Sequence, residues 1–281
     1  MGEAFLIMLR EGFEAALIVA IVMAYLRAVD RRELGRSAWY GVGAGIAVAL
    51  AIGLGVRATV GALEGEARMV AFAAISASAA AVLTWMIFWM RKQGSATRAE
   101  LQAQVDRALA SGRGGRGVLL VTFAAVLREG IEAALFLLAA TLDTTSDAVI
   151  IGAIAGLAVA VLIGVALYAG GRHISVQVFF RVTGVLLILF AAGLCAKTVF
   201  FLQAAGDLGT LDDAAYNLTA QHWLTVGSES GRVLAGLFGW DPRPSVEQVV
   251  VYLAYLVPVG ALFMAGERRK PARRPAVAQQ A

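Results

Sequence analysis

The chain has 281 residues, of which 59% are hydrophobic and 16% are charged. A soluble domain carries roughly 25% charged and 45–50% apolar residues, so this composition excludes an ordinary soluble globular protein. The net charge of +4 does not indicate nucleic-acid binding, because the basic residues lie in short loops and no nucleic-acid-binding motif is present. The apolar residues gather into long uncharged runs, each near the ~18–20 residues that a helix needs to cross a bilayer.

These runs predict seven membrane-spanning helices. We expect them at residues 4–26, 38–56, 69–90, 117–142, 148–171, 179–202 and 248–266. A helix of a soluble core seldom runs this far without a charge on its wet face. The first run lacks the basic region of a signal peptide, so we interpret it as a retained helix. The sequence therefore predicts an all-α integral membrane protein.

Lysine and arginine predict the orientation of the chain. The first, third and fifth connections and the C-terminal tail together hold 16 of these residues, whereas the other three connections hold four. Cytoplasmic loops of membrane proteins are enriched in Lys and Arg. We therefore expect the N-terminus outside and the C-terminus in the cytoplasm.

Two connections are long enough to hold structure of their own. In the third, Leu101, Val105 and Leu109 recur at four-residue spacing, which predicts an amphipathic helix over 98–110 lying along the membrane surface. In the sixth, we expect short helices near 214–224 and 231–238. The outer loops lean acidic, which fits either simple solubility or a weak funnel for cations.

One stretch occurs twice, 118 residues apart. Residues 9–17 match residues 127–135 except that Ile131 replaces Phe13. A weaker match relates 44–53 to 155–164 at an offset of 111 residues. The first three spans are thus predicted to be duplicated as the next three, and because three is odd, the copies cross the membrane in opposite senses. Transporters with such inverted repeats place their substrate site near the midplane of the membrane.

This interpretation divides the chain into six parts. They are the first three-helix repeat (1–92), a cytoplasmic amphipathic linker (93–116), the second, inverted three-helix repeat (117–202), an extracytoplasmic loop (203–247), a seventh transmembrane helix (248–266) and a basic cytoplasmic tail (267–281).

Six ionisable side chains lie inside the two repeated helices: Arg10, Glu11, Glu14, Arg128, Glu129 and Glu132. A charge at the membrane centre opposes insertion by roughly 2.5–3.5 kcal/mol, so six of them need a compensating role. The spacing lets the arginine of each motif pair with the glutamate four residues later. The intervening glycines, Gly12 and Gly130, allow a neighbouring helix to approach closely.

Where the two motif helices cross, four carboxylates would converge. Carboxylate oxygens suit hard cations, and inward-pointing glutamates on facing helices hold iron in ferritin-like bundles. The alternatives are that the charges only join helices together, or that the glutamates relay protons, which is compatible with metal transport. Two nearly unchanged copies favour a transport site over a purely structural role.

At these residues the chain resembles the oxidase-dependent iron permeases, whose hallmark is Arg-Glu-Gly-x-Glu in the first and fourth membrane helices. Here the motif stands at 10–14 and 128–132, and the segment 83–92 also resembles bacterial members. The resemblance covers nearly the whole chain. It implies iron import across a bacterial cytoplasmic membrane, with transport depending on the motif glutamates and with the motif arginines supporting them.

The resemblance also implies periplasmic partners that bind or oxidise iron, with the iron ion as cargo, surrounding membrane lipid and no tightly bound cofactor. Fungal members carry a further acidic motif in an outer loop. This chain has no clear equivalent, although residues 64–66 or 212–213 are acidic enough to serve.

Two other functions stay open. One is a proton-coupled carrier of another divalent cation such as manganese. The other is a membrane ferroxidase, which is disfavoured because the sequence has no haem or copper ligand set. We therefore expect a transporter and not an enzyme.

The remaining intramembrane candidates are interpreted more simply and are left out of the predicted site. Lys197 either snorkels outward, which we favour, or neutralises a glutamate of the site. Trp85 and Trp89 are interpreted as an interfacial belt. We interpret Met8, Met86 and Cys195 as packing residues and His222 as a surface residue.

Overall fold

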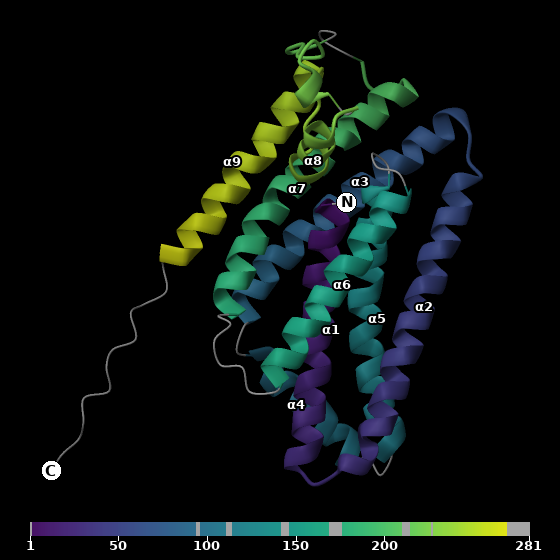
Figure 1. The fold of residues 1–281 in the computed structure, drawn as a ribbon, viewed down its shortest axis with the longest axis vertical. Coiled ribbons are helices and arrows are strands. Elements are labelled where there is room, and N and C mark those ends of the chain that lie inside the picture. The colour runs from purple at the N-terminus through teal and green to yellow at the C-terminus, as the bar shows by residue number, and fades with distance from the viewer. Residues whose placement is uncertain are drawn as a thin grey trace, which may run out of the picture.

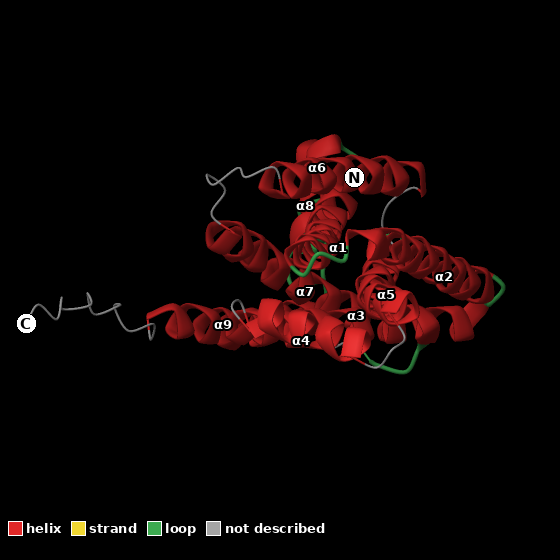
Figure 2. Ribbon diagram, turned by 90° about the horizontal axis from the view of Figure 1, so that it is seen from below, coloured by secondary structure: helices red, strands yellow, loops and turns green. Residues whose placement is uncertain are grey.

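A computed structural model describes residues 2–93, 96–110, 114–141, 146–168, 176–209, 214–225 and 227–268. Within these ranges all regular structure is helical (Figures 1 and 2). The α-helices are α1 (Gly2–Ala28), α2 (Gly35–Gly61), α3 (Gly65–Gln93), α4 (Ala96–Ala110), α5 (Gly114–Ala140), α6 (Ser146–Tyr168), α7 (Val176–Ala205), α8 (Glu229–Phe238) and α9 (Val246–Arg268). Short 3-10 helices are η1 (Arg32–Leu34) and η2 (His222–Leu224).

Every predicted span corresponds to one long helix. Among the described residues, five helices are long and apolar enough to cross a membrane, namely α2, α3, α6, α7 and α9. Helices α1 and α5 have 27 residues each, and they differ from the other five in carrying the charges of the two motifs. The chain is thus an all-α, multi-pass membrane protein, and a total of seven crossings stays a prediction. Residues 142 and 169–171, at the ends of two predicted spans, and 269–281 of the predicted tail lie outside the described residues.

The two motif helices lie next to each other inside the bundle. Helix α1 packs along α6, α5 packs along α2, and α1 also contacts α5 (Figures 1 and 2). A second group is formed by α3 and α7, with α9 packed against α7. Each motif helix therefore has its main partner in the other half of the chain.

Glycines allow these helix pairs to approach closely. A Cβ atom added to Gly45 of α2 would lie 3.1 Å from the backbone nitrogen of Leu127, and one added to Gly156 of α6 would lie 2.9 Å from that of Leu9. Leu127 follows Leu9 by 118 residues, and Gly156 follows Gly45 by 111. The α2–α5 and α6–α1 contacts thus use residues related by the same two offsets as the sequence repeat.

Apolar side chains form two separate clusters. The larger one lies mainly among α3, α5 and α7, which contribute Met86 and Phe136 among others, and it also includes Ile7 of α1 and Phe263 of α9. The smaller one lies where α1 and α5 meet α4. It contains Val22, Leu26, Ala38, Leu101, Val105 and Val118.

The predicted helix over 98–110 is present as α4, but its apolar stripe is not turned toward lipid. Leu101 and Val105 are buried in the smaller cluster, and Leu109 packs against it. Valine and leucine side chains of α1 and α5 offer these residues an apolar surface within the protein. The stripe therefore packs within the protein, and the placement of α4 along the membrane surface stays a prediction.

The loop over 203–247 differs from expectation in one segment. Only η2 is helical within 214–224, so the helix predicted there was wrong. The backbone nitrogens of Ala215 and Leu218 donate instead to the carbonyl oxygens of Pro244 and Pro242, and Asn217 accepts from the backbone nitrogen of Thr219. These bonds draw the backbone away from a helical pattern.

The second helix predicted in the outer loop is confirmed as α8. The Ser228 side chain caps its first turn by accepting from the backbone nitrogen of Gly231. Gly239 ends it in the left-handed region, with φ of 64°, where glycine carries no steric cost. Helix α8 packs against α7 and α1, and Gly239 lies directly against Gly193 of α7.

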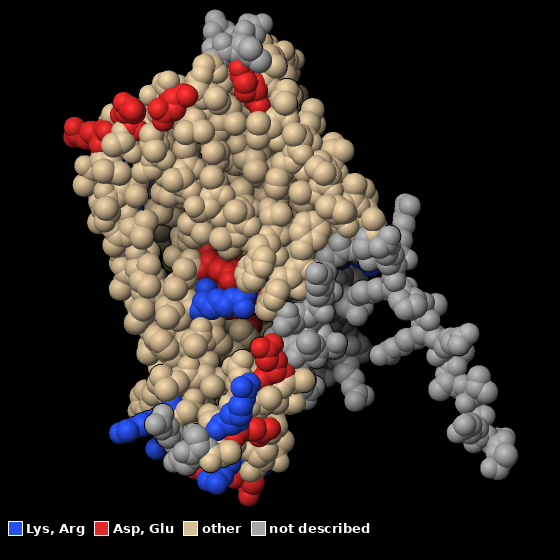
Figure 3. All heavy atoms as spheres, turned by 180° about the vertical axis from the view of Figure 1, so that it is seen from behind, with Lys and Arg blue, Asp and Glu red and all other residues tan. Residues whose placement is uncertain are grey.

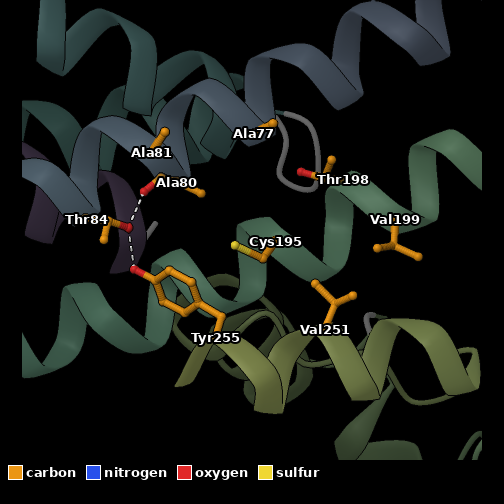
Figure 4. Close-up of a pocket in the computed structure, with 9 residues that line it drawn as sticks. All are labelled: Ala77, Ala80, Ala81, Thr84, Cys195, Thr198, Val199, Val251 and Tyr255. Atoms are coloured by element: carbon orange, nitrogen blue, oxygen red, sulfur yellow. Dashed lines mark hydrogen bonds between the residues drawn. The ribbon is translucent and has the colours of Figure 1, made fainter. Parts of the chain in front are cut away.

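A cavity of about 350 Å³ lies between α3, α7 and α9 (Figure 4). Its lining is mostly apolar and includes Cys195, which packs against the larger cluster as expected of a small packing residue. On one side, the hydroxyl oxygens of Thr84 and Tyr255 lie 2.6 Å apart. No carboxylate is among the described residues that line it, so this cavity is distinct from the charged motifs.

Candidate metal site

The first motif places its arginine against both of its own carboxylates. On α1, Arg10 Nε lies 3.2 Å from Glu14 Oε1, and Arg10 Nη1 lies 3.7 Å from Glu11 Oε1. The Arg10 side chain is 3% exposed and that of Glu11 2%. The i, i+4 spacing brings Arg10 to Glu14 within the helix, and burial keeps water away from all three groups.

The second motif has the same pair but a different environment. On α5, Arg128 Nε donates to Glu132 Oε1 over 3.0 Å. Glu129 and Glu132 are buried, whereas the Arg128 side chain is 39% exposed. Nearly identical sequences therefore give one enclosed arginine and one at the edge of the bundle.

Three glutamates from the two motif helices meet in a group. Glu11, Glu14 and Glu129 each offer a carboxylate oxygen, and these three oxygens lie within 4.8 Å of one another. Two carboxylate oxygens on opposite sides of a small divalent ion are about 4–4.4 Å apart, given metal–oxygen bonds of about 2.0–2.2 Å. The three oxygens therefore match a cation-binding site after only small side-chain movements.

Glu132 lies beside this group without belonging to it. Its carboxylate is held by Arg128, and it interacts electrostatically with Glu11 and Glu14. The predicted four glutamates are thus found as three candidate ligands and one charge-paired neighbour.

Three of these carboxylates have oxygens that lack hydrogen-bond partners. Oε2 of Glu11, Oε1 of Glu14 and Oε2 of Glu132 are buried and accept no hydrogen bond among the described residues. A buried carboxylate oxygen without a partner is costly, and a bound cation or a proton removes that cost.

On the face shown in Figure 3, acidic and basic side chains emerge together in the middle of a broad uncharged surface.

The motif glycines lie against the partner helices. A Cβ atom added to Gly12 would lie 2.9 Å from Leu157 Cδ1 and 3.0 Å from Ala160 Cβ, and one added to Gly130 would lie 2.6 Å from Ala49 Cβ. Larger residues at these positions would push α6 or α2 away from the motif helices.

The indole rings of α3 were left out of the predicted site, yet they contact it. The guanidinium carbon of Arg128 lies 4.5 Å from the ring centroid of Trp89 and 5.5 Å from that of Trp85. The two rings stack on each other with centroids 5.7 Å apart. The i, i+4 spacing of two tryptophans was a signal for one aromatic surface, but the contact with α5 depends on the tertiary fold.

Glu3 was also missed. It is 4% exposed, it lies two turns before Glu11, and it interacts electrostatically with Lys197 of α7. An acidic residue in the first turn of a helix is ordinary, so Glu3 carries no signal of a special role in the sequence. Lys197 thus has Glu3 as an acidic neighbour, a role for which the sequence had suggested a motif glutamate.

The other candidates lie outside the glutamate group. Met86 is buried in the larger apolar cluster, as expected of a packing residue. His222, Glu64 and Glu66 are exposed. The acidic pair at 212–213 lies outside the described residues.

Comparisons with known proteins agree with the motif. The model of the iron permease FTR1 family matches residues 1–268. The chain is 37% identical over 260 residues to the ferrous iron permease EfeU of Yersinia pestis, with 92% of each chain covered. It is 36% identical to the ferrous iron permeases EfeU of Escherichia coli O6:K15:H31 and Shigella sonnei, with 92% of this chain and 94% of each relative covered. No solved structure matches.

The family match covers almost the entire chain, and both the helical architecture and the buried glutamate group agree with a transport protein. This chain therefore belongs to the iron permease FTR1 family, and it is a permease and not an enzyme.

Proposed function

We propose that this protein imports iron across a bacterial cytoplasmic membrane and that the ion passes through the glutamate group between α1 and α5. The observation that carries the proposal is the convergence of Glu11, Glu14 and Glu129 within 4.8 Å, on two adjacent helices. The names of the relatives, ferrous iron permeases, support iron as the cargo.

The charges of the two motifs suit a divalent cation. Four glutamates and two arginines leave a formal charge of −2 when all are ionised, which an entering Fe²⁺ would balance. Arg10 shares Glu14 with the site, so binding of the ion would draw Glu14 away from its arginine, and release would restore that pair. The arginines thereby limit repulsion among the carboxylates while the site is empty.

The proposal includes an inverted repeat, with 1–92 and 117–202 as its halves. The glycine contacts support it, because α2 meets α5 through residues that correspond to those joining α6 to α1. One more pair follows the rule: a Cβ added to Gly53 would lie 3.1 Å from Ala134 Cβ, and one added to Gly164 would lie 2.7 Å from Ala16 Cβ. Transporters built this way expose a central site to each side in turn by moving one half against the other.

In the proposed orientation the N-terminus faces outward and the end of the bundle that carries α4 faces the cytoplasm. The loop 203–247 is then extracytoplasmic and offers a surface for partners that bind or oxidise iron. The excess of Lys and Arg in the opposite connections supports this orientation.

The test is uptake of radioactive iron into proteoliposomes that contain the purified protein. We expect time-dependent uptake that Glu14→Gln abolishes, because the amide keeps the shape of the side chain but loses its charge. Glu33→Gln, whose side chain is 60% exposed in the same half of the chain, is the matched control and should transport normally. Uptake by Glu14→Gln at the normal rate would refute the site.

The same vesicles separate the two alternative functions. Strong competition by manganese together with manganese uptake would favour the broader divalent carrier. Oxygen consumption with ferrous iron, in the absence of any uptake, would favour a ferroxidase.

A further inference from the structure

The two motif arginines have different neighbours. Arg10 is enclosed and lies within 4 Å of both carboxylates of its motif. For Arg128 the one ion pair found within 4 Å in the described residues is that with Glu132. Its guanidinium also lies over two stacked indole rings from α3. The difference arises outside the motif, since the sequence around the two arginines is the same.

We propose that Trp89, backed by Trp85, is a positioning residue that directs the Arg128 guanidinium toward Glu132 and keeps it away from Glu129. This inference rests on the proposed function, because Glu129 is one of the three candidate metal ligands. A guanidinium stacks on the face of an indole, and its N–H groups remain free for a carboxylate in its own plane. Arg128 meets both conditions, with Trp89 at 4.5 Å and Glu132 Oε1 at 3.0 Å.

The first motif shows that an arginine at this position can reach both carboxylates of its motif. Arg10 lies within 4 Å of the adjacent Glu11 as well as of Glu14. An Arg128 released from the indoles would have the same option toward Glu129, which is its next residue. Glu129 would then be charge-paired, and the metal would have to compete with Arg128 for its one ligand from α5.

Exposure toward lipid explains why Arg128 needs such a platform. The Arg128 side chain is 39% exposed on the surface of helices that we expect to face lipid. A cation at that depth tends to move toward a polar partner or toward water. The electron-rich faces of the two indoles stabilise the positive charge of the guanidinium in its observed position. Trp85 is exposed and so lies between the guanidinium and the expected lipid.

The inference is tested with Trp89→Leu in the full-length protein, using Mn²⁺ as a stable divalent probe. Titration calorimetry in detergent gives the dissociation constant, and iron uptake in vesicles gives KM and maximal rate separately. We expect the dissociation constant and KM to rise roughly five- to tenfold in Trp89→Leu, with a smaller change in maximal rate. Trp89→Phe, which keeps an aromatic face, should recover most of the affinity. Trp223→Leu, an exposed indole of the outer loop, is the control and should bind normally.

A second variant shows whether Trp89 acts through the arginine. In an Arg128→Gln background, Trp89→Leu should cause no further loss of Mn²⁺ affinity. If Trp89→Leu lowered Mn²⁺ affinity equally in both backgrounds, the inference would be overturned. A lower melting temperature of Trp89→Leu with unchanged Mn²⁺ affinity would also overturn it. Normal affinity in Trp89→Leu alongside lost binding in Glu14→Gln would also overturn it and would leave the proposed function intact. Normal binding and uptake in Glu14→Gln would instead remove the proposed function itself.

Discussion

Helices α1 and α5 carry the same motif in different environments. Each helix forms the same internal ion pair, with Arg10 at 3.2 Å from Glu14 and Arg128 at 3.0 Å from Glu132. The differences come from the helices around them. Helix α5 lies along α3, which brings two indoles to Arg128, whereas α1 contacts α7 only briefly. Helical spacing thus determines the pairs, and tertiary packing determines which carboxylate is left for a metal.

The ends of the two helices differ as well. Glu3 of α1 corresponds, at the offset of 118 residues, to Val121 of α5. Glu3 is buried and interacts with Lys197, whereas Val121 packs against the smaller apolar cluster. The two copies of the motif helix therefore carry different chemistry at corresponding positions.

The largest expected effect concerns the shared carboxylates. Glu11→Gln should reduce iron uptake in vesicles to background, because Glu11 is fully enclosed and belongs to the three-oxygen group. Membrane insertion should be unchanged, as judged by the amount of protein recovered from membranes. Uptake close to that of the unchanged protein would show that Glu11 is not a ligand.

The next prediction sharpens the comparison within α5. Glu129→Gln should weaken Mn²⁺ binding about tenfold more than Glu132→Gln. Glu129 belongs to the three-oxygen group, whereas the carboxylate of Glu132 is bound by Arg128. Calorimetry on both variants measures the ratio. Equal losses of Mn²⁺ affinity would mean that the two carboxylates are equivalent. They would contradict the distinction between Glu129 as a ligand and Glu132 as a neighbour.

A third prediction tests the contact between α2 and α5. Gly41→Ala should lower stability by about 1–3 kcal/mol, because its Cβ would collide with Thr122 Oγ1 and the carbonyl oxygen of Leu119. Gly43→Ala is the matched control in the same helix, with no atom within 4 Å of the added Cβ. It should be neutral or slightly stabilising, since alanine favours a helix. Thermal unfolding in detergent distinguishes the two, and equal melting temperatures would contradict the close approach.

The smallest effect is expected at the outer end of α1. Lys197→Met removes the cation that interacts with Glu3 and should lower the melting temperature by a few degrees. Adding Glu3→Gln should restore part of that loss, because the amide carries no charge that needs a partner. A double variant less stable than Lys197→Met alone would show that the two residues are not coupled.

Much of the helical framework could be predicted from sequence, because uncharged runs and the repeated motif are local patterns. The proximity of Glu11, Glu14 and Glu129 followed from the assumption that two copies of one motif meet. The stacking of Arg128 on Trp89 could not be predicted, since it joins residues from different helices and neither segment alone indicates which residue it will contact. The segment 214–221 escaped prediction for a similar reason, because its backbone bonds lead to residues 242–244, far along the chain.

Helix α4 has a consequence for the energetics of transport. It packs on both motif helices, Leu101 and Val105 are buried between them, and Tyr25 of α1 donates a hydrogen bond to Asp106 of α4. Any movement that separates α1 from α5 at this end must uncover these side chains, at about 25 cal/mol for each Å² of apolar surface. Helix α4 thus opposes separation of α1 and α5, and a state opened at this end would have to expose the side chains of this small apolar cluster.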